Sequence, residues 1–277
     1  MRIRLRRRGI DHGWFTPSPR ETSLARAEPV VLRRAVKPPG CRPELALIDR
    51  LRSGDDLAAL ATPPRGFRFT GVSQNTQDPL ELHKLHVDPG DLYVKVNWLS
   101  AHRGDGSLRL RFSYGAEIVD DHVHDPRRVK RTLALVDALF PAVRVATRRF
   151  SSMKLIQPIV YSNQPDGGAL FHHDFVPGQA GVVFTQLAGS TAWLTLPQRE
   201  LQRIAGPRVD LDAFERLLNH TPAFTRRLAD EGWLFVLAPG DALVLPSRTY
   251  DTAAWHSVFT VGRGGNLALS CGFTCPP

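Results

Sequence analysis

The stretch GALFHHDFVPG, residues 168–178, places two histidines and an aspartate in a row between aromatic residues. In a β-strand, residues i and i+2 point to the same face, so His172 and Asp174 would project together while His173 points away. Buried imidazole and carboxylate groups are costly unless a hydrogen bond, solvent or a metal ion satisfies them. The pair can therefore supply one nitrogen and one oxygen ligand to a metal ion.

A third ligand is offered by the segment AAWHSVF, residues 253–259, in which His256 stands among apolar residues at the start of an expected strand. Two histidines and one carboxylate on one face of a metal leave three open positions, as in the non-haem Fe(II) oxygenases. The alternative is a metal-free site, with a hydrogen-bonded His172–Asp174 pair and an unrelated His256. If His173 were the ligand instead, no carboxylate would lie at i+2, so we expect it beside the site.

The residues around these three candidates match a wider pattern. The segment 171–197 resembles jumonji C and related cupin-like oxygenases, in which a His-x-Asp motif is followed by a glutamine, a glycine, a tryptophan and a proline. Residues 239–258 are similar to the second half of that pattern, with a Gly-Asp turn, a strand that ends in proline and the distal histidine. The matching residues are Gln186, Gly189, Trp193, Pro197, Gly240, Asp241, Pro246 and His256.

This resemblance covers about residues 151–277 and implies a double-stranded β-helix, the jelly-roll of the cupin class. It also implies an Fe(II) ion held by His172, Asp174 and His256, with 2-oxoglutarate and molecular oxygen as co-substrates. In that family, oxidative decarboxylation of 2-oxoglutarate to succinate and carbon dioxide accompanies hydroxylation of a C–H bond. The implied substrate is a peptide or protein side chain, or a small natural-product intermediate.

The chain departs from the family pattern at the residue that anchors the co-substrate. A lysine two positions after the matching glycine usually binds the distal carboxylate of 2-oxoglutarate, and Thr191 stands there instead. A buried carboxylate without a cation is costly. Three cations are candidates for the missing contact. Arg263, just before the last expected strand, is the first choice, followed by Lys154 on the strand before the motif, and Arg248 in the loop before His256.

Two rival functions follow from this departure. The first is a cupin dioxygenase that needs no 2-oxoglutarate. The second is a cupin that binds a ligand and catalyses no reaction. Iron content would separate the second rival from both enzymes, and succinate production would separate the two enzymes from each other.

The expected architecture is mainly β with helical additions. Residues 1–40 are rich in Arg, Pro and Ser and predict an irregular basic arm. Residues 41–150 predict a mixed α/β segment that supports the barrel, with helices over about 43–54 and 124–141 and strands over 91–100 and 107–118. Residues 151–277 predict the double-stranded β-helix core, in which a helical insert at about 198–232 is expected to lie near the barrel mouth as a lid.

Composition narrows the class of protein. There are 36 Lys and Arg against 27 Asp and Glu, a net charge of +9, yet no zinc-finger, basic-zipper or aromatic RNA-binding signature accompanies them. We therefore expect no nucleic-acid partner, whereas an anionic substrate stays open. The three cysteines argue against a disulfide scaffold and for a reducing compartment. Without an apolar run of about 20 residues or a secretory leader, a soluble cytoplasmic protein is expected.

Two further histidine clusters are weaker candidates for metal binding. The sequence DDHVHD, residues 120–125, precedes an expected helix, and acidic residues are favourable at helix N-termini. The sequence HKLH, residues 83–86, has no evident third ligand and is expected at the surface. Trp193 and Trp255 are expected in the core.

Overall fold

The computed structural model describes residues 10–12, 28–52, 65–73, 81–88, 92–98, 108–114, 126–150, 153–165, 167–206 and 222–274. The cluster at 120–125, the middle of the helical insert and Cys275 lie outside the described residues. Among the helices of the described part, none is both long and apolar enough to cross a membrane.

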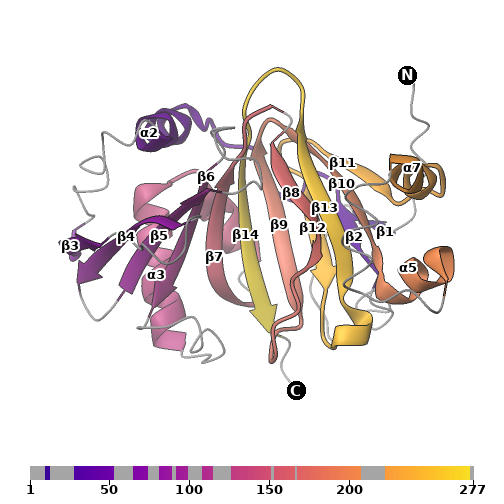
Figure 1. Cartoon of the computed structure of the whole chain (residues 1–277). Coiled ribbons are helices and arrows are strands. Elements are labelled where there is room, and N and C mark those ends of the chain that lie inside the picture. The colour runs from indigo at the N-terminus through magenta and orange to yellow at the C-terminus, as the bar shows by residue number, and fades with distance from the viewer. Residues whose placement is uncertain are drawn as a thin grey trace.

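Two β-sheets form the body of the molecule (Figure 1). The major sheet has ten strands, in the spatial order β1 (Ile10–His12), β2 (Val30–Leu32), β12 (Ala242–Pro246), β9 (Gly181–Ala188), β14 (Leu267–Thr274), β7 (Lys154–Ser162), β6 (Leu108–Tyr114), β5 (Leu92–Trp98), β4 (Glu81–Asp88) and β3 (Arg68–Ser73). The minor sheet has four strands, in the order β11 (Leu234–Leu237), β10 (Ser190–Pro197), β13 (Ala254–Val261) and β8 (Gly168–His173).

The eight strands from β7 to β14 are distributed between the two sheets. The major sheet contains the run β12-β9-β14-β7 and the minor sheet the run β11-β10-β13-β8, and all neighbours in both runs are antiparallel. From β7 to β14 the chain therefore passes to the other sheet at every connection except the one between β10 and β11. This is the strand order of a double-stranded β-helix, so the predicted fold class is confirmed.

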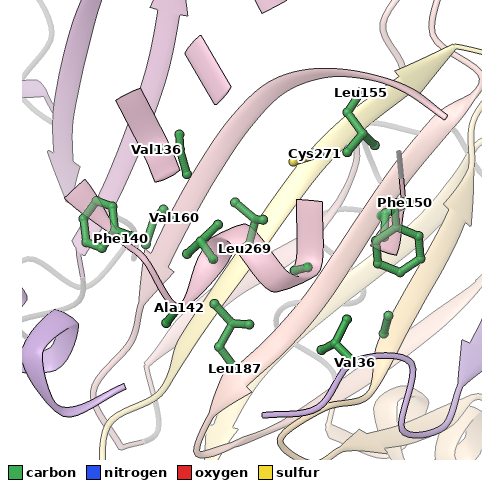
Figure 2. Packing of buried hydrophobic residues seen from close by; sticks show 14 of the residues in the cluster. Val36, Val136, Phe140, Ala142, Phe150, Leu155, Val160, Leu187, Leu269 and Cys271 are labelled. Atoms are coloured by element: carbon green, nitrogen blue, oxygen red, sulfur yellow. The ribbon is translucent and has the colours of Figure 1, made fainter. Parts of the chain in front are cut away.

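Alternating side chains separate the interior of the barrel from the outer faces of the sheets. On β12, Leu243 and Leu245 belong to the cluster between the sheets, whereas Ala242 and Val244 belong to the cluster on the outer face of the major sheet. That outer cluster also receives side chains from the helices α2 (Arg42–Arg52), α3 (Pro126–Leu139) and α4 (Val143–Arg149), as Figure 2 shows for Val136 and Ala142 near the core strands. Both faces of the central strands are thus buried, and their sequences are nearly continuous apolar runs.

The segment 41–150 contains the elements that the sequence predicts. The helix α2 and the helix α3 lie where the two helical patterns predict them, and β5 and β6 lie where the two alternating patterns predict strands. The strands β3 to β6 continue the major sheet beyond β7. The HKLH sequence, residues 83–86, lies within β4.

The helical insert does not close the barrel through its described helices. The helices α5 (Gln198–Ala205) and α7 (Pro222–Asp230) pack their apolar residues, such as Leu201 and Leu228, against Leu194 and Trp255 of the minor sheet. In Figure 1 both helices lie beside the strands of that sheet. Both helices cover the outer face of the minor sheet, and neither lines the pocket described below. The lid stays a prediction, since the middle of the insert lies outside the described residues.

Residues 28–40 differ from the predicted irregular arm. The strand β2 pairs antiparallel with β12, and its three residues, Val30 to Leu32, are no more than 1% exposed. Val30 and Leu32 join the outer cluster, and Val31 joins the cluster between the sheets. Because arginine and proline dominate the composition of residues 1–40, composition alone does not predict this short apolar strand. The strand extends the major sheet by pairing with a distant segment.

A buried carboxylate fixes the segment that follows β2. Asp241, in the Gly-Asp turn between β11 and β12, is 5% exposed and accepts a hydrogen bond of 2.7 Å from the Arg33 guanidinium. It also accepts the backbone N–H groups of Arg34, at 2.9 Å, and Ala238, at 3.1 Å. The Asp241 carboxylate thus satisfies three donors, and its role in this structure is to stabilise the Gly-Asp turn.

Cys41 and Cys271 are buried free thiols. Burial raises the pKa of Cys41 to about 11, with a further contribution from Glu44, and burial raises the pKa of Cys271 to about 12. Because the thiolate is the reactive form, we expect neither residue to react with iodoacetamide at pH 8 in the folded chain and both to react in concentrated urea. Peptide mass spectrometry measures this, and rapid alkylation of either residue without denaturant would contradict the burial.

Candidate metal centre

The strands β8 and β13 bring the predicted ligands together. His172 lies directly opposite His256 in their antiparallel ladder. The register shifts between His256 and Val258, and at Gly168 the backbone of β8 approaches the carbonyl of Val258 so closely that any β-carbon would overlap it. Glycine at the start of β8 therefore permits the close pairing that places the two imidazoles side by side.

The three candidate ligands converge on one point. The imidazole Nε2 atoms of His172 and His256 lie 3.6 Å and 3.4 Å from the two carboxylate oxygens of Asp174, and the two imidazole ring centres are 4.4 Å apart. One ligand atom from each residue lies within 4.8 Å of the others. His256 is buried, with a side chain 4% exposed, whereas those of His172 and Asp174 are 38% and 45% exposed. The His256 side of the site is therefore buried in the barrel, and the side of His172 and Asp174 is open to solvent.

Backbone carbonyls fix the tautomer of both histidines. The Nδ1 of His172 lies 2.7 Å from the carbonyl oxygen of Leu170, and the Nδ1 of His256 lies 3.1 Å from that of Ala254. A carbonyl oxygen only accepts hydrogen bonds, so each Nδ1 carries a hydrogen, and Nε2 is the atom left to bind a metal ion at the centre of the site. This is the arrangement that holds histidine ligands around a metal ion.

The surroundings of His172 favour its neutral form. The protein atoms around the ring exclude water, and this desolvation lowers the pKa of His172 from the ordinary histidine value; the neighbouring His256 lowers it further. Asp174 acts in the opposite direction without reversing the shift. A metal ion binds the neutral imidazole, so the lowered pKa of His172 makes the ligand form available at neutral pH.

His173 lies outside the convergent group, as the alternation of strand residues predicts. Its Nδ1 accepts the backbone N–H of Phe175 at 3.3 Å, and its ring packs edge-on against Trp255 and Tyr250, with ring centres 4.9 Å and 5.1 Å apart. Trp255 is also 4% exposed, in agreement with its expected place in the core.

A cavity of about 180 Å³ extends from the three ligands into the space between the sheets. The major sheet contributes a polar wall opposite the histidines, made by Tyr161, Asn163 and Ser270. Asn163 is 2% exposed, and its carbonyl oxygen Oδ1 has no hydrogen-bond partner. The rest of the lining is mostly apolar, from Ala169, Val182, Phe184, Trp193, Leu245 and Val258. A buried, unpaired acceptor on a residue that lines the cavity is suited to bind a ligand that donates a hydrogen bond.

The motif residues after His-x-Asp form a hydrogen-bonded chain that positions one wall of this cavity. The Thr191 hydroxyl donates to the Gln186 side-chain oxygen at 2.8 Å and accepts the Trp193 indole N–H at 2.9 Å. Gly189 makes the turn before them with a φ of 66°. Thr191 is fully buried and does not line the cavity, whereas the Trp193 ring does. In place of the family's lysine, the chain therefore has a threonine that fixes a tryptophan.

The three predicted anchoring cations are exposed, and no lysine or arginine is among the described residues that line the cavity. Arg263 lies after the end of β13, the opposite end from His256. Lys154 is the first residue of β7, roughly 20 Å along the strand from Tyr161 at about 3.3 Å per residue. Arg248 lies in the connection between Leu245 and His256, which both line the cavity.

The polar wall does not follow from the sequence alone. Tyr161 and Asn163 are two positions apart at the end of β7, so strand alternation places them on one face. Alternation alone does not tell which sheet faces the histidines. That information comes from the pairing of β7 with β14, which carries Ser270.

Comparisons with known proteins give distant structural neighbours. No protein-family model and no curated protein matches the chain. A solved structure of YcfD, a ribosomal oxygenase from Escherichia coli, is 16% identical over 90% of this chain and 48% of its own, with a TM-score of 0.38. The same protein in complex with cobalt and succinic acid is 17% identical over 90% and 49%, with a TM-score of 0.39. The chain spans about half the length of these neighbours, and the fold assignment above rests on strand order.

Proposed function

We propose that the chain is a non-haem Fe(II)-dependent oxygenase. The observation that carries this proposal is the convergence of two fixed Nε2 lone pairs and one carboxylate at the open edge of the cavity. Three protein ligands on one face leave positions for oxygen and a second ligand. The residues fit a divalent transition metal because both imidazoles direct Nε2 toward the carboxylate, which would balance part of the metal's charge.

Within this function, we propose 2-oxoglutarate as co-substrate and a C–H bond of a peptide side chain or small molecule as substrate. Bound iron would supply the redox chemistry with molecular oxygen. The residues of the chain would orient the substrate and exclude water. His172, Asp174 and His256 would hold the metal, and the polar wall at Asn163 would orient the ligand that reaches across the cavity. Phe184, Trp193 and Val258 would exclude water from the reacting atoms.

The lining of the cavity gives a second candidate function specific support. A dicarboxylate needs a cation or several donors for its far carboxylate, and apart from His172, Asp174 and His256 the described lining offers uncharged groups. An oxygenase that uses the same metal but binds an uncharged, hydrogen-bonding substrate directly, without 2-oxoglutarate, agrees with that lining. A non-catalytic ligand-binding cupin would consume no oxygen, which separates it from both enzymes.

For 2-oxoglutarate binding, we rank Arg248 first among the three cations, because its loop connects Leu245 and His256, which both line the cavity. Arg248→Ala should raise the dissociation constant of 2-oxoglutarate roughly ten- to a hundredfold, because it removes a charge-assisted contact worth about 1.5–3 kcal/mol. Arg263→Ala is the matched control, since it removes an equally exposed arginine at the far end of β13. Anaerobic calorimetry with Fe(II) present measures both variants, and equal affinities would remove Arg248 as the anchor.

The test of the function itself is the consumption of oxygen by the Fe(II)-loaded chain, with succinate measured alongside. Oxygen uptake that depends on 2-oxoglutarate and yields equal succinate supports the first candidate. Uptake that is independent of 2-oxoglutarate and yields no succinate supports the second. If the iron-loaded protein consumes no oxygen with any 2-oxo acid or candidate substrate, the non-catalytic alternative is favoured.

A further inference from the structure

A cationic groove lies on the surface between two segments that are far apart in the sequence. It has a volume of about 490 Å³ and is lined by Arg34, Ala35, Val36, Lys37, Val145, Arg148 and Arg149. Four of these seven residues are cations, all four are exposed, and no carboxylate is among the lining. The first four residues follow β2, and the other three belong to α4.

The first side of the groove is held in a fixed and strained conformation. Arg34 has a φ of 52°, in the left-handed region that is unfavourable for a residue with a long side chain. The Asp241 carboxylate accepts the Arg34 N–H, and the Gly240 carbonyl accepts the Val36 N–H at 3.0 Å. These contacts keep the Arg34 and Lys37 side chains on the groove side. Backbone strain that the surrounding structure maintains is characteristic of functional positions.

The second side of the groove is fixed by the hydrophobic core. Val143 and Ala146 of α4 share one buried cluster with Val36 from the opposite side of the groove, and Figure 2 labels Val36 among the residues of that cluster. Arg148 and Arg149 stand in the last turn of α4. Asp137 interacts electrostatically with Arg144 and Arg148, and the buried Asp241 accepts the Arg34 N–H. Neither carboxylate is among the described residues that line the groove, so the lining itself carries positive charge.

The groove is separated from the metal centre. The helices α3 and α4 and the residues Val30, Leu32 and Val36 pack on the outer face of the major sheet. The metal cavity lies on the other face, between the sheets. A ligand in the groove therefore contacts none of the residues proposed to bind iron or co-substrate.

Against the expectation from composition, we infer that this groove binds the phosphate backbone of a nucleic acid, because the fold gathers cations that are far apart in the sequence. Arginine guanidinium groups match phosphate oxygens with paired hydrogen bonds. Exposed cations bind a single anion weakly, whereas a polymer of phosphates gains from several contacts and from the release of counterions. An acidic protein partner fits less well, because protein interfaces need buried apolar or aromatic anchors and the groove offers an exposed Val145 at most. Phosphate contacts carry no sequence information, so we expect binding with little sequence preference.

The test compares two double variants with the same change in net charge. In Arg148→Glu/Arg149→Glu the groove loses two cations, and in Arg65→Glu/Arg226→Glu two exposed arginines outside the groove lining are reversed. The probe is a short fluorescein-labelled RNA duplex, titrated by anisotropy at several salt concentrations. We expect the groove variant to weaken binding at least tenfold and to lower the salt-dependence slope by about 2, at roughly 0.9 per lost phosphate contact. The control variant should stay within about threefold of wild type.

A second variant separates binding from stability. Arg34→Gly/Lys37→Ala removes the other two cations and places glycine at a φ that suits it, so the melting temperature should not fall while RNA affinity does. Equal weakening in the groove and control variants would mean that total charge alone attracts RNA, and absence of wild-type binding would overturn the inference. Displacement of RNA by polyglutamate, with tighter polyglutamate binding to wild type, would assign the groove to an acidic protein instead.

Discussion

Replacing His256 with alanine should abolish tight metal binding while leaving a folded barrel. His256 supplies one of three ligand atoms and is the most buried of the three. Loss of an outer hydrogen-bond partner of a metal ligand already weakens metal affinity about 10- to 100-fold, so loss of the ligand itself should exceed about 100-fold. Calorimetric titration with Co(II) measures the affinity, and circular dichroism follows the fold.

His173→Ala is the matched control for this experiment. It removes a histidine next to His172 whose Nδ1 accepts the Phe175 N–H and whose ring packs away from the ligands. We expect wild-type metal affinity in this variant. Unchanged Co(II) affinity in His256→Ala, or equal losses in His256→Ala and His173→Ala, would contradict the ligand assignment. His256→Gln, which keeps most of the side-chain volume, guards against loss of metal through unfolding.

Deleting residues 1–40 should destabilise the protein severely. The deletion removes β2, whose three apolar residues are almost completely buried, and burial of each such side chain contributes about 1.5–3 kcal/mol. The sum is comparable with the whole net stability of a typical domain, about 5–15 kcal/mol. It also removes the Arg33–Asp241 ion pair and exposes the edge of β12. Thermal denaturation of the truncated chain measures the effect.

Point variants locate that effect in β2. Leu32→Ala should lower the free energy of unfolding by about 2–5 kcal/mol, because Leu32 is 1% exposed within the core. Lys37→Ala, five residues further along and exposed, should change it by less than about 0.5 kcal/mol. A truncated chain that melts at the wild-type temperature would show that β2 contributes nothing to the barrel.

The sequence predicts which three side chains converge because two of them are close neighbours in the chain. His172 and Asp174 lie two residues apart, so strand alternation alone aligns them, and the flanking motif points to His256 as their partner. The barrel is predictable for a related reason, since the short apolar runs after residue 151 are separated by Gly and Pro. The family pattern also indicates Gln186 and Trp193, which the structure joins through Thr191.

The parts that escape prediction depend on long-range pairing. The strand β2 is three residues long and is stabilised by pairing with β12, more than 200 residues away in the chain. The insert helices carry apolar faces, but which surface they cover follows from the outward side of β10. The first choice of anchoring cation changes from Arg263 to Arg248, because β13 places Arg263 and His256 at opposite ends of one strand.

The most direct test of the proposed metal centre is an anaerobic Fe(II) titration of the wild-type protein, with and without 2-oxoglutarate. We predict binding of one equivalent of Fe(II) per chain. If 2-oxoglutarate is the co-substrate, its addition should produce a weak visible charge-transfer band that oxygen then bleaches. Stoichiometric iron without that band would retain the metal centre and favour the oxygenase that needs no 2-oxoglutarate. Failure to bind Fe(II) stoichiometrically, in a protein shown to be folded, would contradict the central claim.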